Sequence, residues 1–137
     1  MKPWEIALKE YGTLEDVTSG SNPRVLEYFA KVGHSWVKDD ATAWCAAFVG
    51  WCLESCNIKS TKKLNARSYL EWGITTTGPR IGDIAVLWRI SPTSSYGHVA
   101  FFIKRDEKYV WLLGGNQADQ VKIEKYPLSQ VLGYRTY

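Results

Sequence analysis

Apolar residues recur at helical spacing through the first half of the chain. Residues 3–11 space their apolar side chains for one helix face, and the segment SNPRVLEYFAKVG predicts a second helix that Ser21 or Asn22 caps. The same pattern predicts a third helix over 42–56 and a fourth over 65–72. The amino-terminal half is therefore expected to be helical.

The second half of the chain changes to the β-branched and aromatic residues that favour strands. Five strands are predicted, over 84–90, 98–105, 108–114, 121–126 and 131–137. The short Asp106-Glu107 spacing is typical of a hairpin, and Gly114-Gly115 is expected to end a strand abruptly. Helices followed by an antiparallel sheet indicate a single α+β domain that covers residues 1–137.

Composition and charge limit the classes of partner. The net charge of the 137 residues is only +3, and no cluster of Lys and Arg resembles a nucleic-acid-binding patch. No stretch approaches the roughly 20 apolar residues that a membrane span needs. The first residues, MKPWEIALKEYG, are amphipathic and lack the apolar segment of a signal peptide. We therefore expect synthesis in the cytoplasm, no nucleic-acid partner and no membrane span.

All three cysteines lie in one stretch, DDATAWCAAFVGWCLESC. Cys45 is near the start of the predicted third helix, where free N–H groups and the helix dipole favour a thiolate. Cys52 and Cys56 have a spacing that could share a metal, but no second Cys/His pair at zinc-finger spacing accompanies them. We interpret these two as small apolar side chains of a helix and expect no metal or other cofactor. Cys45 is the candidate nucleophile.

A nucleophilic cysteine needs a base and a group that orients the base. His34 follows a predicted helix end and reads as a surface or capping residue, whereas His98 in SYGHVAFF stands where a loop becomes a strand. The next strand ends in GGNQ. If the two strands form a hairpin, Asn116 meets His98 at one edge of the sheet and fixes its tautomer. The order of Cys45, His98 and Asn116 along the chain is that of papain-like folds.

At these residues the sequence resembles a family of small phage- and bacterium-borne proteins related to the CHAP and NlpC/P60 cysteine peptidases. The matching segments occur in order and cover nearly the whole chain: SNPRVLEY (21–28), WCAAFVGWCLE (44–54), ARSYLEWG (66–73), GDIAVLW (82–88), GHVAFF (97–102), LGGNQADQV (113–121) and LGYR (132–135). The resemblance implies a papain-like fold, with helices packed on a carboxy-terminal antiparallel sheet. It also implies hydrolysis of an amide bond in peptidoglycan.

The resemblance assigns roles to three residues: Cys45 as nucleophile, His98 as base and Asn116 as third member. The backbone N–H of Cys45 would stabilise the oxyanion, with a second backbone donor between Asp40 and Trp44. Four neighbours of the three positions are candidates to line the substrate cleft: Trp44, Trp88, Tyr96 and Gln117. The Trp pair could equally belong to the core.

Two other functions fit the same sequence. The triad could act on a non-wall amide, as in a toxin delivered into a rival cell, or the domain could be a non-catalytic wall-binding or virion structural module. A wall substrate would require export, by a holin or a secretion system, and a phage, secretion or immunity partner is conceivable for such a chain. The sequence leaves the cleaved bond and the wall type open.

Overall fold

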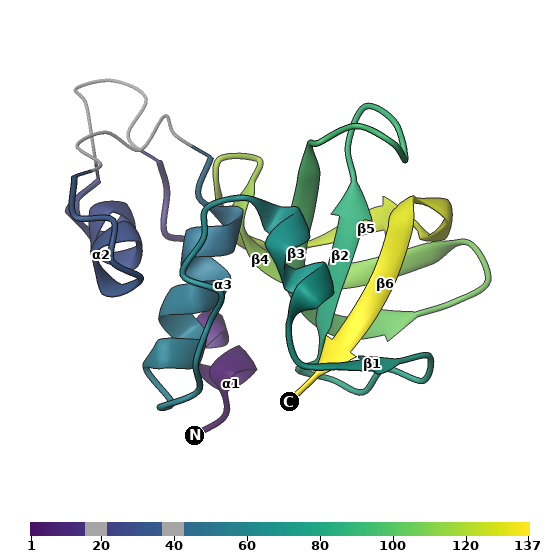
Figure 1. Cartoon of the computed structure of the whole chain (residues 1–137), viewed down its shortest axis with the longest axis horizontal. Helices are drawn as coiled ribbons and strands as arrows, with labels where there is room; N and C mark the ends of the chain where they lie inside the picture. Colours follow the sequence, from purple (N-terminus) through teal and green to yellow (C-terminus); the bar gives the residue numbers. More distant parts are fainter. Residues whose placement is uncertain (16–21, 37–42) are drawn as a thin grey trace.

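The computed structural model describes residues 1–15, 22–36 and 43–137 (Figure 1). Three α-helices come first and a six-stranded antiparallel sheet follows, which confirms the α+β fold predicted from the sequence. The helices are α1 (Pro3–Lys9), α2 (Pro23–Lys31) and α3 (Cys45–Glu54). None of the helices in the described part of the chain is long and apolar enough to cross a membrane.

α3 is buried on nearly every side, as expected for a helix that is apolar all round. α2 packs against it from outside, with Val25, Tyr28 and Phe29 buried. The contact is close because Gly50 of α3 has no side chain: a Cβ there would lie 2.6 Å from Cγ1 of Val32. This packing fixes α3, and hence its first residue, in the centre of the molecule.

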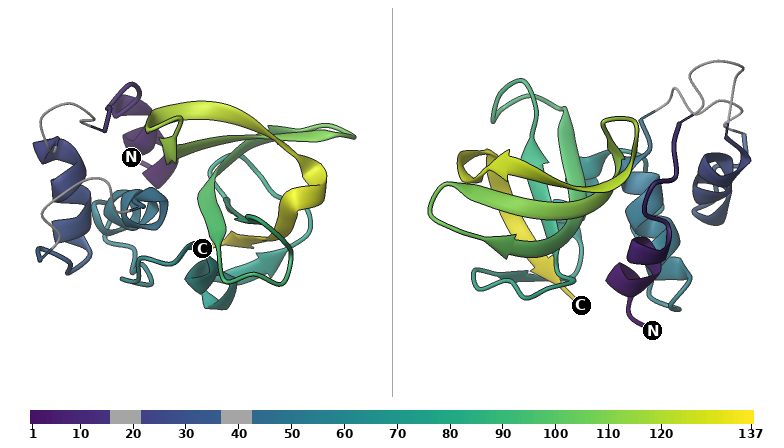
Figure 2. Two further views of the ribbon diagram at one scale, coloured as in Figure 1. Left: turned by 90° about the horizontal axis from the view of Figure 1, so that it is seen from above. Right: turned by 180° about the vertical axis from the view of Figure 1, so that it is seen from behind.

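The six strands form one sheet in the order β1–β6–β2–β3–β4–β5. Their bounds are β1 (Ile74–Thr76), β2 (Ile84–Trp88), β3 (Gly97–Arg105), β4 (Tyr109–Gln117), β5 (Gln120–Pro127) and β6 (Val131–Thr136). β2 to β5 lie side by side in chain order, and β6 returns to pair with both β1 and β2. Viewed from above, the sheet curls strongly (Figure 2).

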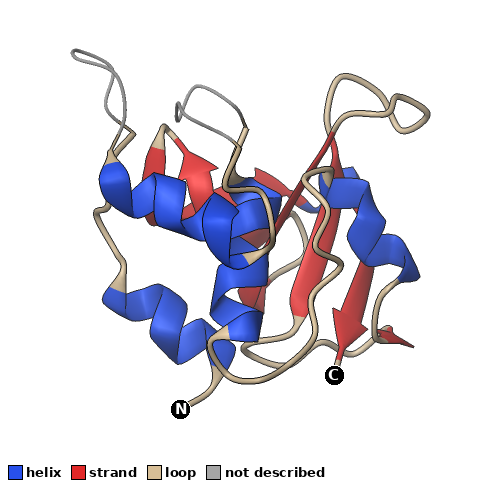
Figure 3. Cartoon of the chain, turned by 60° about the vertical axis from the view of Figure 1, so that its left-hand side comes forward, coloured by secondary structure: helices blue, strands red, loops and turns tan. Residues whose placement is uncertain are grey.

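The two faces of the curled sheet bury different clusters. Ile84 and Val86 of β2 pack toward the helices, whereas Ala85 and Leu87, which alternate with them, pack into a second cluster on the other face. α1 and α3 lie against the first face, so helices and strands form two layers (Figure 3). The main core is therefore the space between α3 and the sheet.

Local structure differs from the sequence predictions in three places. The predicted helix over 65–72 is a short 3-10 helix, η1 (Ala66–Glu71), and a second one, η2 (Leu128–Gln130), precedes β6. The pattern does not predict β1, because its three residues show no buried–exposed alternation. β4 does not end at Gly114-Gly115 but continues to Gln117.

The start of α2 has the cap that the sequence predicts. The Asn22 side chain accepts a hydrogen bond from the Arg24 N–H at 2.8 Å. The alternative cap, Ser21, lies outside the described residues, as does residue 42. The third helix, predicted to start at residue 42, begins only at Cys45, with Trp44 as its N-cap residue.

Candidate active site

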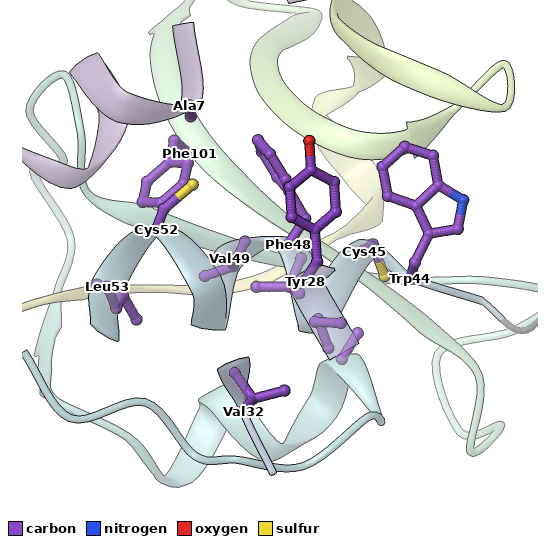
Figure 4. Close-up of a cluster of buried hydrophobic side chains, with 14 of the residues drawn as sticks. Ala7, Tyr28, Val32, Trp44, Cys45, Phe48, Val49, Cys52, Leu53 and Phe101 are labelled. Atoms are coloured by element: carbon purple, nitrogen blue, oxygen red, sulfur yellow. The ribbon is translucent and has the colours of Figure 1, made fainter. Parts of the chain in front are cut away.

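α3 begins at Cys45, so the thiol lies at the helix end whose N–H groups have no partner in the helix. The first ladder bond runs from the Phe48 N–H to the Trp44 carbonyl at 2.9 Å, which leaves the N–H groups of Cys45 and Ala46 free of the ladder. Both are directed at the Cys45 sulfur. Cys45 and Trp44 lie at one end of the helix, and Cys52 lies toward the other (Figure 4).

The beginning of β3 approaches the same thiol. Pairing between β3 and β4 starts at Phe101↔Leu113. Among the described residues, the first four residues of β3, 97–100, therefore have no partner on β4. The N–H of Val99 is directed at the Cys45 sulfur, which places the thiol beside the residue that follows His98. Within the described residues no hydrogen bond joins the thiol to the imidazole, and the polar groups that act on the thiol pKa are backbone N–H groups and the charge of Arg89.

A hydrogen bond to Gln117 fixes which nitrogen of His98 carries a proton. His98 Nε2 lies 2.8 Å from Gln117 Oε1. The Gln117 amide nitrogen donates to the carbonyls of Leu112 at 3.2 Å and Lys122 at 2.6 Å. Because carbonyls only accept, they hold the amide with Oε1 toward the imidazole, and Nε2 must be the donor. Neutral His98 therefore keeps its lone pair on Nδ1, as a general base requires.

Gln117 occupies the place that the sequence predicts for Asn116. Extending the Phe101↔Leu113 register in a straight hairpin would set Asn116 opposite His98. However, the pairing of β4 shifts between Gly114 and Gln117, and Asn116 has a φ of 58°. Such a bulge advances the side-chain alternation by one residue. In the described structure the His98 Nε2–H donates to Gln117 and not to Asn116, whose third-member role stays a prediction that this geometry does not support.

Two glycines of β4 make room for the Gln117 side chain and for the start of α3. A Cβ on Gly114 would lie 2.6 Å from the Ala100 Cβ and 3.1 Å from Gln117 Oε1, while one on Gly115 would lie 2.7 Å from the Trp44 ring. Both positions therefore need glycine for close packing within the strand rather than for ending it. They bring β4 against the start of α3 and leave room for the Gln117 amide.

Burial favours the neutral forms of both reactive groups. Cys45 is 4% exposed and His98 is 3% exposed. Burial lowers the pKa of His98 to about 4, although the Gln117 hydrogen bond raises it and the charge of Arg89 lowers it further. Burial also raises the pKa of the Cys45 thiol, against the N–H groups and Arg89, which lower it. The resting pair is a neutral thiol and a neutral imidazole, so the proton must move as the sulfur attacks.

Two residues near His98 were not among the sequence predictions. The Tyr126 ring lies 5.3 Å from the His98 ring, and its hydroxyl oxygen lies 3.3 Å from Nε2. Burial raises the pKa of Tyr126, so its hydroxyl stays protonated. Arg89, directly after β2, acts by its charge on Cys45, His98 and Tyr126. Only the strand register brings either residue to the site, so no local motif could have found them.

The four predicted substrate contacts have different surroundings. Trp44 is fully buried, so its ring belongs to the core, and this corrects its prediction as a cleft residue. Gln117 is 1% exposed and bonds to His98, which also removes it from the predicted substrate surface. Trp88 is half-buried and donates its indole N–H to a carbonyl in the connection before β6. Tyr96 is 63% exposed and remains available to a substrate.

The other sulfur and imidazole groups have structural surroundings. Cys52 is fully buried, and the Cys56 thiol donates to the Met1 carbonyl at 3.2 Å. His34 Nε2 lies 2.7 Å from the Lys62 carbonyl. The described residues contain no group of three or more His, Cys, Asp or Glu side chains that could hold a metal ion.

Comparison with known proteins places the chain in a family. The family model of the CHAP domain matches residues 37–116, more than half of the 137 residues. No curated protein sequence matches significantly. A crystal structure described as similar to lipoprotein, NLP/P60 family, from Staphylococcus aureus has a TM-score of 0.53 and 17% identity, and the match covers 97% of this chain and 39% of that one. At this identity the likeness concerns the fold alone. The chain belongs to the CHAP domain family and has the α+β, papain-like fold of NlpC/P60 proteins.

Proposed function

We propose that this protein is a cysteine hydrolase that cleaves an amide bond of peptidoglycan, in the stem peptide or at the muramoyl-L-alanine link. Proteins of the CHAP and NlpC/P60 families are generally cysteine peptidases or amidases. One observation carries the proposal for this chain: Gln117 holds His98 as the Nε2–H tautomer, with Nδ1 unprotonated, beside the strand residue whose N–H reaches the Cys45 thiol. Packing alone does not require such an oriented imidazole next to a helix-terminal thiol.

The reaction begins with transfer of the Cys45 thiol proton to Nδ1 of His98 while the sulfur attacks the amide carbonyl carbon. The tetrahedral intermediate collapses, the C–N bond breaks, and the leaving amine takes the proton from Nδ1. Water then gives a proton to Nδ1 as its oxygen attacks the thioester. When the C–S bond breaks, the thiolate recovers that proton, and the products are a carboxylic acid and an amine.

The oxyanion would form at the start of α3. The Cys45 N–H is outside the helical ladder and lies at the positive end of the helix dipole. One such donor contributes about 3 kcal/mol to transition-state stabilisation in known hydrolases. A second backbone donor is predicted between Asp40 and Trp44, and residues 40–42 of that segment lie outside the described residues.

Export by a holin or a secretion system belongs to the same proposal, since a wall substrate lies outside the cytoplasm. The sequence motifs further favour membership of the family of small phage- and bacterium-borne hydrolases. Such a protein would have a lytic role in a phage or an effector role in a bacterium. Asn116, predicted as the third catalytic member, is replaced in this proposal by Gln117 as a positioning residue.

The test is digestion of purified sacculi from several wall types, with released fragments identified by mass spectrometry. A new amino or carboxyl terminus on each fragment identifies the bond and separates amidase from endopeptidase. Wild-type protein is expected to release fragments, and Cys45→Ala is expected to release none. Binding to sacculi without turnover by either protein would favour the structural module, and turnover of a different amide would favour the toxin.

A further inference from the structure

Arg89 occupies the face of the sheet on which His98 lies. β2 and β3 pair as Leu87↔His98 and Trp88↔Gly97, and the ladder continues with a hydrogen bond from the Arg89 N–H to the Tyr96 carbonyl at 3.3 Å. Side chains two residues apart on a strand share a face, so Arg89 is the diagonal neighbour of His98. Diagonal neighbours are about 7–8 Å apart at their backbones, within reach of a long side chain.

Among the residues that the structure describes, none is a hydrogen-bond or ion-pair partner of the Arg89 guanidinium. The Arg89 side chain is also exposed. Two arginines elsewhere in the chain do have partners: Arg24 pairs with Glu10 at 2.6 Å, and Arg135 donates to the Leu70 carbonyl at 2.8 Å. Within the described residues, the side-chain donors of this exposed arginine, Arg89, are therefore left for solvent or a ligand.

The loop after Arg89 is held in one conformation by hydrogen bonds. The Arg67 guanidinium of η1 donates to the carbonyls of Tyr96 at 2.9 Å, Pro92 at 3.1 Å and Ser91 at 3.3 Å. The Ser94 hydroxyl donates to the Arg89 carbonyl. Both ends of the loop are thus fixed, so the backbone that carries Arg89 is preorganised for binding.

The positive charge of Arg89 helps one of the two catalytic groups and hinders the other. The charge of Arg89 lowers the pKa of Cys45, which favours the thiolate, but it also lowers the pKa of His98 and so weakens the base. An anion bound at the guanidinium would offset both effects when the substrate arrives, and would thereby restore the basicity of His98. Guanidinium and carboxylate form two parallel hydrogen bonds, a geometry that a Lys ammonium does not provide.

We propose that Arg89 binds a carboxylate of the substrate next to the scissile amide, so that the enzyme selects anionic wall peptides over their amidated forms. This inference rests on the proposed function, because it names the substrate class of the same site.

The test measures binding separately from turnover. All variants are made in the Cys45→Ala background and titrated with one synthetic stem peptide, carrying either a free α-carboxylate or the corresponding carboxamide. The acid is expected to bind about tenfold more tightly than the amide. Arg89→Gln should abolish that preference, and Arg89→Lys should restore it in part. Arg80→Gln is the matched control, because Arg80 is also exposed and precedes the opposite end of β2.

Equal affinity of the Cys45→Ala protein for acid and amide, no measurable binding of the acid, or a preference that survives Arg89→Gln would each overturn the inference. None of these three results contradicts the proposed function, which is tested separately by hydrolysis of sacculi by the wild-type protein. Conversely, a carboxylate preference that depends on Arg89, without turnover of any wall peptide by the wild-type protein, would support the binding site and refute the hydrolase.

Discussion

Replacing Gln117 and Asn116 in turn decides which of the two neighbours orients His98. Gln117→Met keeps the length of the side chain but removes the acceptor for the His98 Nε2–H and the donors for two carbonyls. A buried polar group left without a partner costs about 1–3 kcal/mol. Three such groups are affected and some will find other partners, so we expect a loss of about 2–4 kcal/mol in the free energy of unfolding.

The larger effect is expected on the reaction. Without Oε1 of residue 117, the His98 ring is free to change tautomer and to rotate, and a misplacement of this size costs about 100-fold in rate. The fall should be in kcat, with KM nearly unchanged, because Gln117 is buried away from any substrate. Nitrogen NMR of the imidazole should show one Nε2–H tautomer in the wild-type protein and a mixture in Gln117→Met.

Asn116→Gly is the matched control. Glycine adopts the φ of 58° found at residue 116 without strain, so the variant should keep the bulge, the tautomer and the activity. Thermal unfolding establishes first that both variants are folded at the assay temperature. A fully active Gln117→Met, or an Asn116→Gly that loses as much activity as Gln117→Met, would refute the assignment of Gln117 as the positioning residue.

Two further predictions concern stability. The pKa of His98 is lowered to about 4 in the folded protein, from about 6.5 in the unfolded chain, so the unfolded state takes up a proton first as the pH falls. The free energy of unfolding should therefore drop by roughly 2–3 kcal/mol between pH 6.5 and 4.5 in denaturant titrations, and an equal drop in His98→Gln would contradict this origin. Gly115→Ala places a Cβ 2.7 Å from the Trp44 ring and should cost about 1–3 kcal/mol in thermal unfolding, whereas Gly78→Ala meets nothing within 4 Å. Equal stability of the two alanine variants would show that β4 and α3 do not pack this closely.

Much of the fold follows from patterns that the sequence shows directly. The apolar run around Cys45 predicts a buried helix, and the change to β-branched residues after residue 80 predicts the sheet. Five of the six strands were predicted near their observed positions. β1 was not, because its pairing with β6 comes from the end of the chain and leaves no local signal.

Only those residues of the site that have a local sequence signal could be predicted from the sequence. Cys45 at a helix start and His98 at the beginning of a strand are recognisable from neighbouring residues alone. The identity of the partner of His98 depends on a one-residue shift in β4, and the sequence GGNQ does not reveal on which residue the shift falls. Arg89 and Tyr126 reach the site through strand pairing, which requires the whole sheet. The sequence leaves Trp44 open between cleft and core, because a tryptophan beside a nucleophile can be either buried or exposed, and the structure decides for the core.

The rate at which Cys45→Ala releases fragments from sacculi, relative to wild type, tests the central claim most directly. Cys56→Ala serves as the control, since Cys56 is a half-buried thiol of the same region whose contact is with the Met1 carbonyl. The proposed chemistry predicts a loss of about 1,000-fold or more for Cys45→Ala and an unchanged rate for Cys56→Ala. A Cys45→Ala protein that is folded and keeps a rate within tenfold of wild type would contradict a nucleophilic role for Cys45.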